Sequence, residues 1–528
     1  MKVLLLSFYA NSMVSIYEEP GIGYIAAYLR KSGITVELDV ARPAAINYDM
    51  IRQYSPELIG ISMYNTSKEA VFEAGKEIKK RFPKVKICVG GYCPSFLREE
   101  ILLTCPSIDF VIFGEGEQTM LELVQALENG TDLSSVQGLI YRRKNMVKIN
   151  QERTLFPQIK DLPWPARDLT KRKLYNISLI LSARGCTSNC SFCLTKQHWK
   201  KWRGRDPVDV VNEIEFIHKS YGIYVFYFID CSFENPGINY KRTKEITQKL
   251  IKRKLPIFYY AFMRSDFFRG VSPDLMQQLK ESGMIGAVLG IESANQRDLS
   301  LYGKTASVED NHTAACMLDK YGIHMDVGFI MFNPFSTFEG LFENISFLEK
   351  YQLACNVDYW GSLYAMYKGC SLNQKIIESN LVYDKENLYG YHFENPLIEK
   401  MALYAFSYNK SVQRESMQIR SLLTIQAYWE QIFEKQEKYA EAIMQTSHIF
   451  APLKAEFNSA VSTWFKALLA LDQDGWNQNE ADRLTDKIFS NRYIRETASK
   501  LSNEHLNLKL KLSRLGLDLT STPFIEKF

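Results

Sequence analysis

The sequence is poor in several features that would narrow its function at once. Histidine is scarce, with 7 in 528 residues and none before His198, and no apolar stretch approaches the ~20 residues that a membrane span needs. The net charge of +4 indicates neither a nucleic-acid surface nor a membrane surface. No small-residue cleavage site follows the apolar start MKVLLLSFYA, so we expect a buried first strand and a cytoplasmic protein.

The length and composition predict a folded chain of several domains. With 528 residues, 46% of them hydrophobic, the chain is too long for one compact core. We predict a Rossmann-like domain at 1–145, a linker at 146–172, a partial barrel at 173–370 and a mainly helical domain at 371–528.

Short apolar runs alternate with amphipathic stretches over residues 1–128. Within each run, apolar and polar residues do not alternate, as is typical of strands buried on both faces. The runs lie at 2–9, 35–40, 58–63, 85–90 and 109–113. The amphipathic stretches lie near 22–32, 44–54, 67–82, 95–103 and 117–128. This pattern predicts an α/β, doubly wound, Rossmann-like parallel sheet. The turn at Asn129-Gly130 and the prolines of LPWPARDL predict a structured linker over 129–172.

The alternation returns over residues 175–363. Strands are predicted at 177–182, 224–229, 256–262, 286–291, 324–331 and 356–363. Six strands with helices between them predict a partial (β/α)6 TIM-type barrel, with functional residues at the C-terminal ends of the strands. From about 395 the strand signal fades, and Phe457, Val461, Trp464 and Leu468 recur at helical spacing, so we expect a helical C-terminal domain.

Three of the ten cysteines are tightly grouped, and the other seven are scattered. Cys186, Cys190 and Cys193 form a C-x3-C-x2-C arrangement directly after the predicted strand ISLILS. Thiolates suit iron–sulfur clusters, and three of them hold three corners of a cubane while leaving the fourth iron open. The alternative is a zinc site with His198 as the fourth ligand.

With Phe192 before the last cysteine, this motif resembles the radical S-adenosylmethionine superfamily over about 175–363. The resemblance implies a 4Fe-4S cluster whose open iron chelates S-adenosylmethionine. It implies that an electron from the cluster cleaves this cosubstrate to a 5′-deoxyadenosyl radical, which abstracts hydrogen from an unactivated carbon. It also implies an electron donor such as flavodoxin or ferredoxin.

The same resemblance suggests contacts to the cosubstrate. They are Phe192 and the strand-end residues Asp230, Arg264, Ser265 and Glu292. Carboxylates accept from ribose hydroxyls and ammonium, and arginine binds carboxylates. The alternative is that they are solvated strand-end polar groups. The chain has no clear Gly-Gly-Glu tripeptide after the second strand, where many members of the superfamily have one.

Small residues follow the strands of the N-terminal sheet, where doubly wound sheets bind ligands. The stretches PGIGYIAAYLRKSGITVELD, GISMYN, VGGYCPS, DFVIFGEGEQTMLELVQAL, VQGLIYR and LPWPARDL together resemble the cobalamin-binding domain that precedes the radical domain in one subclass. The implied cobalamin contacts are Gly21, Ser62, Tyr64, Asn65, Gly90, Gly91, Gly114, Glu115 and Gly116. The D-x-H-x-x-G motif is missing, so the resemblance implies no cobalt-capping histidine from this domain and allows that the cofactor has been lost.

From these observations we expect a cobalamin-dependent radical enzyme that methylates an unactivated carbon of a small-molecule or peptide substrate. Ring formation or rearrangement without methyl transfer is the alternative within the same subclass. A noncatalytic iron–sulfur redox or sensing module is the alternative from another class. We expect no nucleic acid and no membrane as partners. Cys88, Cys93 and Cys105 do not match the spacing of a second cluster and are read as buried, inert thiols, and Cys231 adjoins the predicted site.

Overall fold

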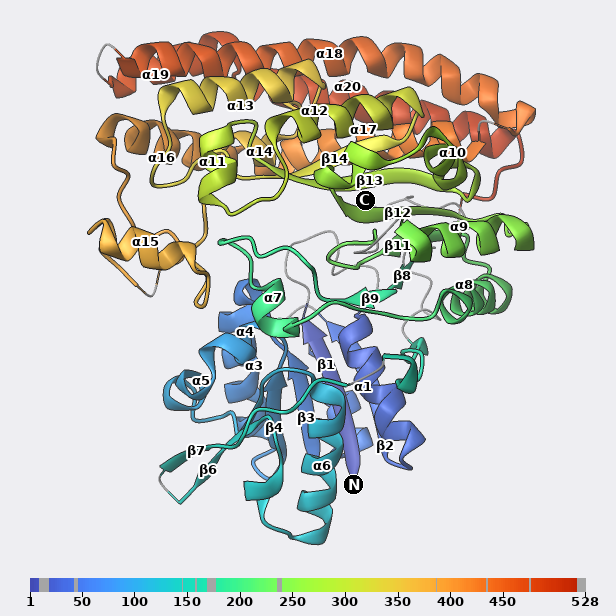
Figure 1. The fold of residues 1–528 in the computed structure, drawn as a ribbon, viewed down its shortest axis with the longest axis vertical. Coiled ribbons are helices and arrows are strands. Elements are labelled where there is room, and N and C mark those ends of the chain that lie inside the picture. The colour runs from blue at the N-terminus through green and yellow to red at the C-terminus, as the bar shows by residue number, and fades with distance from the viewer. Residues whose placement is uncertain are drawn as a thin grey trace. The chain divides into compact units, whose positions relative to one another are not determined.

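The computed structural model describes residues 1–528 except 9–18, 42–45, 145, 157–158, 169–176, 235–239, 386, 434, 474–475 and 520–528. The chain divides into two compact units (Figure 1). Unit 1 comprises Met1–Cys186 and Thr195–Cys231, and unit 2 comprises Thr187–Leu194 and Ser232–Phe528.

A seven-stranded sheet forms the first part of unit 1, in the order β2-β1-β3-β4-β5-β6-β7. Its five parallel strands are β1 (Lys2–Phe8), β2 (Thr35–Ala41), β3 (Leu58–Ser62), β4 (Lys86–Gly90) and β5 (Phe110–Ile112). They match the five runs expected from the sequence, and the order reverses between β1 and β3. Such a reversal leaves a crevice at the C-terminal ends of the strands. The Rossmann-like fold is therefore confirmed.

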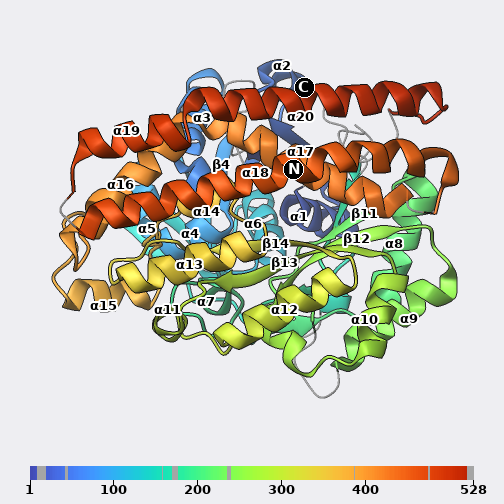
Figure 2. The same cartoon turned by 90° about the horizontal axis from the view of Figure 1, so that it is seen from above.

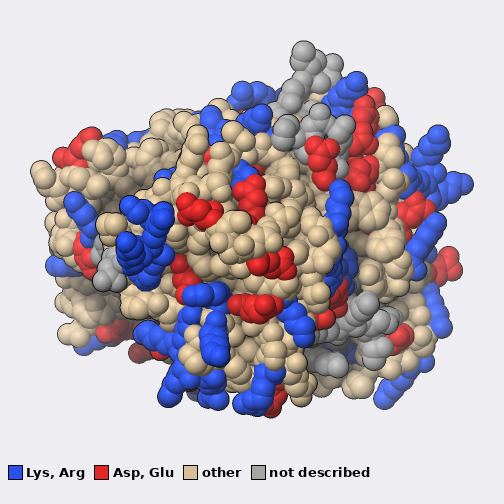
Figure 3. Space-filling view, turned by 90° about the horizontal axis from the view of Figure 1, so that it is seen from below, with Lys and Arg blue, Asp and Glu red and all other residues tan. Residues whose placement is uncertain are grey.

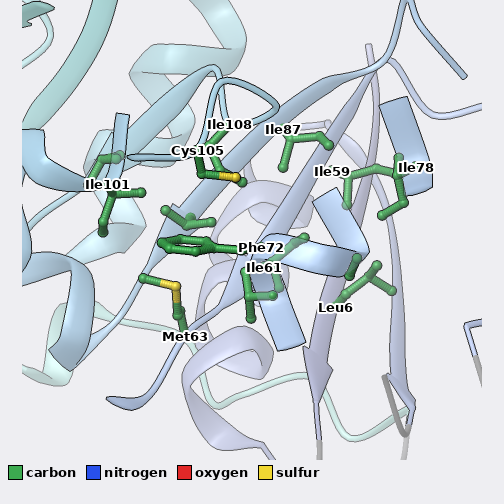
Figure 4. Packing of buried hydrophobic residues seen from close by; sticks show 14 of the residues in the cluster. Leu6, Ile59, Ile61, Met63, Phe72, Ile78, Ile87, Ile101, Cys105 and Ile108 are labelled. Carbon is green, nitrogen blue, oxygen red and sulfur yellow. The ribbon is translucent and has the colours of Figure 1, made fainter. Parts of the chain in front are cut away.

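Helices cover both faces of this sheet, and each face has its own hydrophobic core. On one face lie α1 (Pro20–Lys31) and α6 (Gly116–Asn129). On the other face lie α2 (Tyr48–Tyr54), α3 (Lys68–Arg81), α4 (Tyr92–Leu97) and α5 (Glu99–Thr104), with the short η3 (Asn65–Ser67) before α3. Figure 4 shows the second core, where Phe72 and Cys105 lie among isoleucines from β3, β4 and α5.

The predicted linker contains a β-hairpin that the sequence reasoning missed. β6 (Leu139–Arg143) pairs antiparallel with β5 and with β7 (Met146–Ile149). The strand β7 is mostly exposed, so it lacks the apolar run by which the other strands were found. The hairpin follows η4 (Leu133–Ser135) and precedes η5 (Ile159–Asp161).

The rest of unit 1 contains the first strands of the segment that was predicted to form a partial barrel. β8 (Ile177–Ile180) and β11 (Val225–Phe228) pair in parallel, and β9 (Ala183–Arg184) pairs antiparallel with β10 (Arg203–Gly204). Two helices lie between them, α7 (Thr195–Trp199) and α8 (Pro207–Tyr221). Asp206 caps α8 by accepting from the Val208 amide at 2.7 Å, and Pro207 occupies the first helical turn.

Unit 2 contains three further parallel strands. β12 (Phe258–Arg264), β13 (Met284–Glu292) and β14 (His324–Phe329) form a continuous ladder. The intervening helices are α9 (Lys241–Arg253), η8 (Ser265–Gly270), α10 (Pro273–Glu281), α11 (Gln296–Leu301), α12 (Val308–Lys320) and α13 (Phe338–Lys350).

The sixth predicted strand of the barrel, 356–363, is wrong. This segment forms the helical turn α14 (Val357–Trp360), because the Asn356 side chain accepts from the Asp358 amide at 3.2 Å and starts a turn. A single parallel bridge between Phe332 and Leu363 remains where the strand was expected. The short helix α15 (Leu372–Glu378) follows.

The C-terminal part of the chain is helical, as expected. It contains α16 (Pro396–Ser411), α17 (Gln413–Phe433), α18 (Glu437–Gln473), α19 (Gln478–Ile488) and α20 (Asn491–Arg514). α17, α18 and α20 lie side by side (Figure 2). The ring of Tyr428 on α17 stacks on Tyr260 of β12 at 5.6 Å, and an added Cβ at Gly286 of β13 would lie 2.9 Å from that ring. A glycine is therefore what allows α17 to pack directly on the strands.

Charge is mixed on the face of the molecule drawn in Figure 3, where Lys and Arg side chains lie among Asp and Glu side chains. Within the part of the chain that the structure describes, no helix has both the length and the apolar character to cross a bilayer.

Candidate cofactor-binding site

A cavity of about 250 Å³ lies at the C-terminal ends of the parallel strands in unit 1. Its lining includes eight of the nine residues expected to contact cobalamin, namely Gly21, Ser62, Tyr64, Gly90, Gly91, Gly114, Glu115 and Gly116. Asn65 lies on η3 and is not part of the lining. The fold thus brings these separate sequence stretches together around one space.

Two of these glycines are required by the backbone. Gly91 has φ +115°, and an added Cβ would lie 3.1 Å from the Met63 carbonyl oxygen. Gly114 has φ +77°. At both φ values a residue with a side chain would be strained, so glycine is favoured. Because these two positions carry no side chains, the strand ends leave room for a ligand.

The deep part of the cavity is apolar. Leu5 of β1, Cys88 of β4, Ile112 of β5 and Met120 of α6 line it, together with Gly60 of β3. An added Cβ at Gly60 would lie 2.7 Å from the Leu5 side chain and 3.0 Å from that of Met120. The cavity therefore continues between the sheet and α6, into the core on that face.

Glu115 lines the cavity, and its carboxylate is held by buried arginines. Its carboxylate accepts from Arg184 at 2.8 Å, from Arg203 at 2.9 and 3.0 Å, and from the Phe156 amide at 2.9 Å. Burial would raise the pKa of Glu115, but the hydrogen bond from Arg203 and the charge of Arg184 outweigh it and lower that pKa. Glu115 therefore holds Arg184, which lines the cavity, and Arg203, which is not part of the lining.

His198 and Trp199 of α7 also line the cavity, although they follow the cysteine motif in the sequence. The His198 ring stacks on Tyr92 at 4.3 Å, and its buried Nδ1 has no hydrogen-bond partner among the described residues. Burial lowers the pKa of His198 to about 4, so the imidazole is neutral at physiological pH. No local sequence signal could have placed this histidine against the N-terminal sheet.

The three grouped cysteines differ from the others in exposure. Cys186, Cys190 and Cys193 are partly exposed. In unit 1, Gly185 leads into Cys186 with φ +87°, and an added Cβ would lie 2.5 Å from the Lys201 carbonyl oxygen. In unit 2, the Cys193 amide donates to the Cys190 carbonyl at 3.1 Å, which is a tight turn.

Neighbouring segments of unit 2 fix this turn. The Ser191 amide donates to the Tyr302 carbonyl at 2.8 Å, and the Leu372 amide donates to the Ser191 carbonyl at 3.0 Å. The Cys370 thiol donates to the Phe192 carbonyl at 3.0 Å, and the Phe192 ring meets Tyr302 edge-on at 5.4 Å. Three accessible thiols on held backbone are a donor set that fits an iron–sulfur cluster.

The zinc alternative is weakened by the surroundings of its fourth ligand in unit 1. His198, the fourth ligand of the zinc alternative, packs on Tyr92 instead.

The remaining N-terminal cysteines lie in hydrophobic cores. Cys88 packs on the α1 and α6 face of the sheet, whereas Cys93 and Cys105 pack on the opposite face. Cys105 is labelled in Figure 4. Burial raises the pKa of Cys93 to about 12 and raises that of Cys88 further. Thiols on opposite faces of one sheet cannot share a cluster, so their packing role is the one the structure supports.

The strand ends of unit 2 carry a polar network that includes Arg264. Its guanidinium donates to the hydroxyls of Thr187 and Ser188 at 2.8 and 2.9 Å and lies 3.0 Å from a carboxylate oxygen of Glu234. The other oxygen of Glu234, and the hydroxyl of Ser265, are buried without a hydrogen-bond partner among the described residues. Burial raises the pKa of Glu234 to about 7 despite the charge of Arg264. Such orphaned polar atoms fit a polar ligand bound at this edge, and Glu234 was missed by the sequence reasoning.

The last two expected cosubstrate contacts have different surroundings. Glu292 ends β13 with φ +67° and lies 3.9 Å from the Lys304 ammonium, and burial outweighs that charge to raise the pKa of Glu292. Asp230, in unit 1, is fully buried and accepts from the amides of Ser182 and Ala183 at 2.6 and 2.8 Å. These contacts brace the end of β8, and the assignment of Asp230 to the cosubstrate stays a prediction.

Comparison with known proteins agrees with both parts of this site. A B12 binding domain model matches residues 6–124, and a Radical SAM superfamily model matches residues 180–345. The chain is 29% identical to an uncharacterized methyltransferase of Pyrococcus horikoshii, over 69% of this chain and 79% of that protein. It is 28% identical to the anaerobic magnesium-protoporphyrin IX monomethyl ester cyclase of Rubrivivax gelatinosus, over 72% of this chain and 70% of that protein.

The fold also matches a solved structure over nearly the whole chain. The cobalamin-dependent S-adenosylmethionine radical enzyme OxsB, with aqua-cobalamin bound, superposes with a TM-score of 0.71 at 19% identity. The match covers 97% of this chain and 80% of OxsB.

Proposed function

Because the chain belongs to the radical S-adenosylmethionine superfamily, in the subclass with an N-terminal cobalamin-binding domain, we propose that it is a C-methyltransferase acting on an unactivated carbon. Its cofactors are a 4Fe-4S cluster, S-adenosylmethionine and cobalamin. When bound, the cluster supplies the electron that cleaves S-adenosylmethionine, and cobalamin supplies a methyl carrier.

One observation carries the proposal. The cavity at the edge of the N-terminal sheet is lined by Arg184 and Gly185, the two residues directly before Cys186. The same stretch of chain therefore forms a wall of the proposed cobalamin site and leads into the first cysteine of the proposed cluster site. The proposed methyl transfer uses both groups in one enzyme, and the cavity provides a space for cobalamin beside the residues that lead into Cys186.

Residues of the chain have distinct proposed roles. Cys186, Cys190 and Cys193 hold the cluster, and His198 joins the predicted cobalamin contacts because it lines the same cavity. In unit 2, Glu234 and Arg264 are proposed to bind the amino-acid end of S-adenosylmethionine, since an unpaired buried carboxylate oxygen suits an ammonium group. A reduced flavodoxin or ferredoxin is proposed as the electron donor.

The experiment uses anaerobically reconstituted enzyme, S-adenosylmethionine with a deuterated methyl group, a reductant and a small-molecule and peptide extract of the host cell. We expect a product that carries the deuterated methyl group on carbon, together with equal amounts of 5′-deoxyadenosine and S-adenosylhomocysteine. A Cys193→Ala variant is the control and should give neither the labelled product nor 5′-deoxyadenosine.

Ring formation without methyl transfer is the second candidate, and the similarity to a cyclase favours it. In that case 5′-deoxyadenosine forms without S-adenosylhomocysteine, and the product is unlabelled. If neither nucleoside product forms in any mixture, the enzymatic proposal is wrong and a noncatalytic iron–sulfur module is the better account.

A further inference from the structure

A buried cluster of charges joins the loop after β5 to the residues that lead into Cys186. Arg184 donates to the carboxylate of Glu115 at 2.8 Å and also to that of Glu117, and Arg203 donates to Glu115. The side chain of Arg184 is 3% exposed, and those of Glu115 and Glu117 are 2% and 5% exposed. Ion pairs this deeply buried are held rigidly, because a charge that loses its partner has no water to replace it.

This cluster is part of the cavity wall. Glu115, Glu117 and Arg184 all line the cavity. The guanidinium of Arg184 also lies 5.2 Å from the ring centre of Tyr24 and 5.1 Å from that of Trp199, and both of these rings line the cavity too. A ligand that fills the cavity therefore restricts the side chains that hold Arg184 in place.

Gly185 is the single residue that connects Arg184 to Cys186. Gly185 has φ +87°, and the Lys201 carbonyl and the Trp199 side chain crowd it so closely that an added Cβ would have no room. A displacement of Arg184 therefore reaches the Cys186 backbone through one residue, which is packed against Lys201 and Trp199.

We propose that Glu115, Glu117 and Arg184 are positioning residues that make cobalamin binding in the cavity and iron–sulfur binding at Cys186 depend on each other. The inference rests on the proposed function, because it requires that both groups bind. Restricting the cavity wall holds Cys186 in its binding position, and a cysteine already held by its cluster keeps the wall in place. Thermodynamic linkage requires the two effects to be equal.

The first test measures iron loss rather than turnover. Reconstituted enzyme is challenged anaerobically with an iron chelator, with and without hydroxocobalamin, and the decay of the cluster absorbance is followed. We expect cobalamin to slow iron loss by at least about fivefold, the lower end of ordinary coupling between sites. Cobalamin affinity, measured by equilibrium dialysis with and without the cluster, should also rise when the cluster is present.

The second test compares two buried glutamates. Glu117→Gln keeps the size of the side chain but removes its charge. Glu213→Gln is the matched control, because Glu213 is 1% exposed and pairs with Arg167 and Arg205 but does not line the cavity. We expect the protection by cobalamin to fall below about twofold in Glu117→Gln and to persist in Glu213→Gln.

The outcomes separate this inference from the proposed function. If wild-type enzyme binds both groups but loses iron at the same rate with and without cobalamin, the coupling does not exist, while the proposed function stands. The inference is also overturned if Glu117→Gln keeps full protection. If the wild type binds no cobalamin, the cobalamin-dependent function itself fails. The wild-type comparison decides the matter even if Glu117→Gln does not fold.

Discussion

Replacing Gly185 by alanine should disable the cluster site while leaving its cysteines in the sequence. The residue has φ +87°, where a side chain costs about 1–2 kcal/mol. The new Cβ would also lie 2.5 Å from the Lys201 carbonyl oxygen, which belongs to the backbone and cannot rotate away. Relieving such a contact costs about 1–3 kcal/mol, so the total destabilisation is about 2–5 kcal/mol.

Gly222→Ala provides the matched control. Gly222 lies in the same unit with φ +72°, and nothing lies within 4 Å of the position of its added Cβ. This substitution therefore carries only the backbone cost of about 1–2 kcal/mol. One kcal/mol lowers the melting temperature of a unit of this size by roughly 2–4 °C.

The assay is thermal unfolding of the apoprotein combined with iron content after reconstitution. Gly222→Ala should melt a few degrees below wild type and take up full iron. Gly185→Ala should melt lower still and retain less than about half of the iron, because the backbone shift reaches Cys186. Equal melting temperatures and equal iron content in the two variants would refute the argument from crowding.

Three further predictions concern the cavity and the strand ends. Gly60→Val should weaken cobalamin binding by more than about tenfold and leave the iron content unchanged. The reason is that the valine side chain would enter the space between Leu5 and Met120. Unchanged cobalamin affinity in a dialysis assay would contradict this. His198→Ala should weaken cobalamin binding by up to about tenfold. Because the pKa of His198 is lowered to about 4, His198 itself should contribute no titration between pH 5.5 and 8, so an inflection near 6.5 that the wild type shows and His198→Ala loses would count against it. Burial raises the pKa of Glu234 to about 7, so between pH 4.5 and 7 the folded chain keeps a proton that the unfolded chain releases. Its contribution to the unfolding free energy therefore falls as pH rises through that window, and Glu234→Gln should remove this fall; identical pH profiles of melting temperature would contradict the assignment.

The strands of the N-terminal sheet could be predicted because burial on both faces leaves unbroken apolar runs. The hairpin β6–β7 was not predicted, because β7 is largely exposed and carries no such run. The segment 356–363 is as apolar as a strand, but Asn356 caps a helical turn there, and capping is a local effect that an apolar run does not reveal.

The residues of the candidate site also include some that the sequence predicts and others that it does not. Glycines and small residues at strand ends could be read from the sequence, because the parallel fold fixes where strand ends meet. The partners of Glu115 could not, since Arg184 and Arg203 lie 69 and 88 residues further along the chain. His198 belongs by sequence to the segment after the cysteines, and folding alone brings it to the cavity. The assignments of single residues to cobalamin and S-adenosylmethionine stay predictions.

The central claim is tested most directly by cleavage of S-adenosylmethionine. Reconstituted wild-type enzyme with a reductant should form 5′-deoxyadenosine, while Cys186→Ala, Cys190→Ala and Cys193→Ala should form none and Cys316→Ala should match wild type. Absence of 5′-deoxyadenosine from a wild-type sample with a full cluster, or its undiminished formation by any of the three variants, would contradict the account.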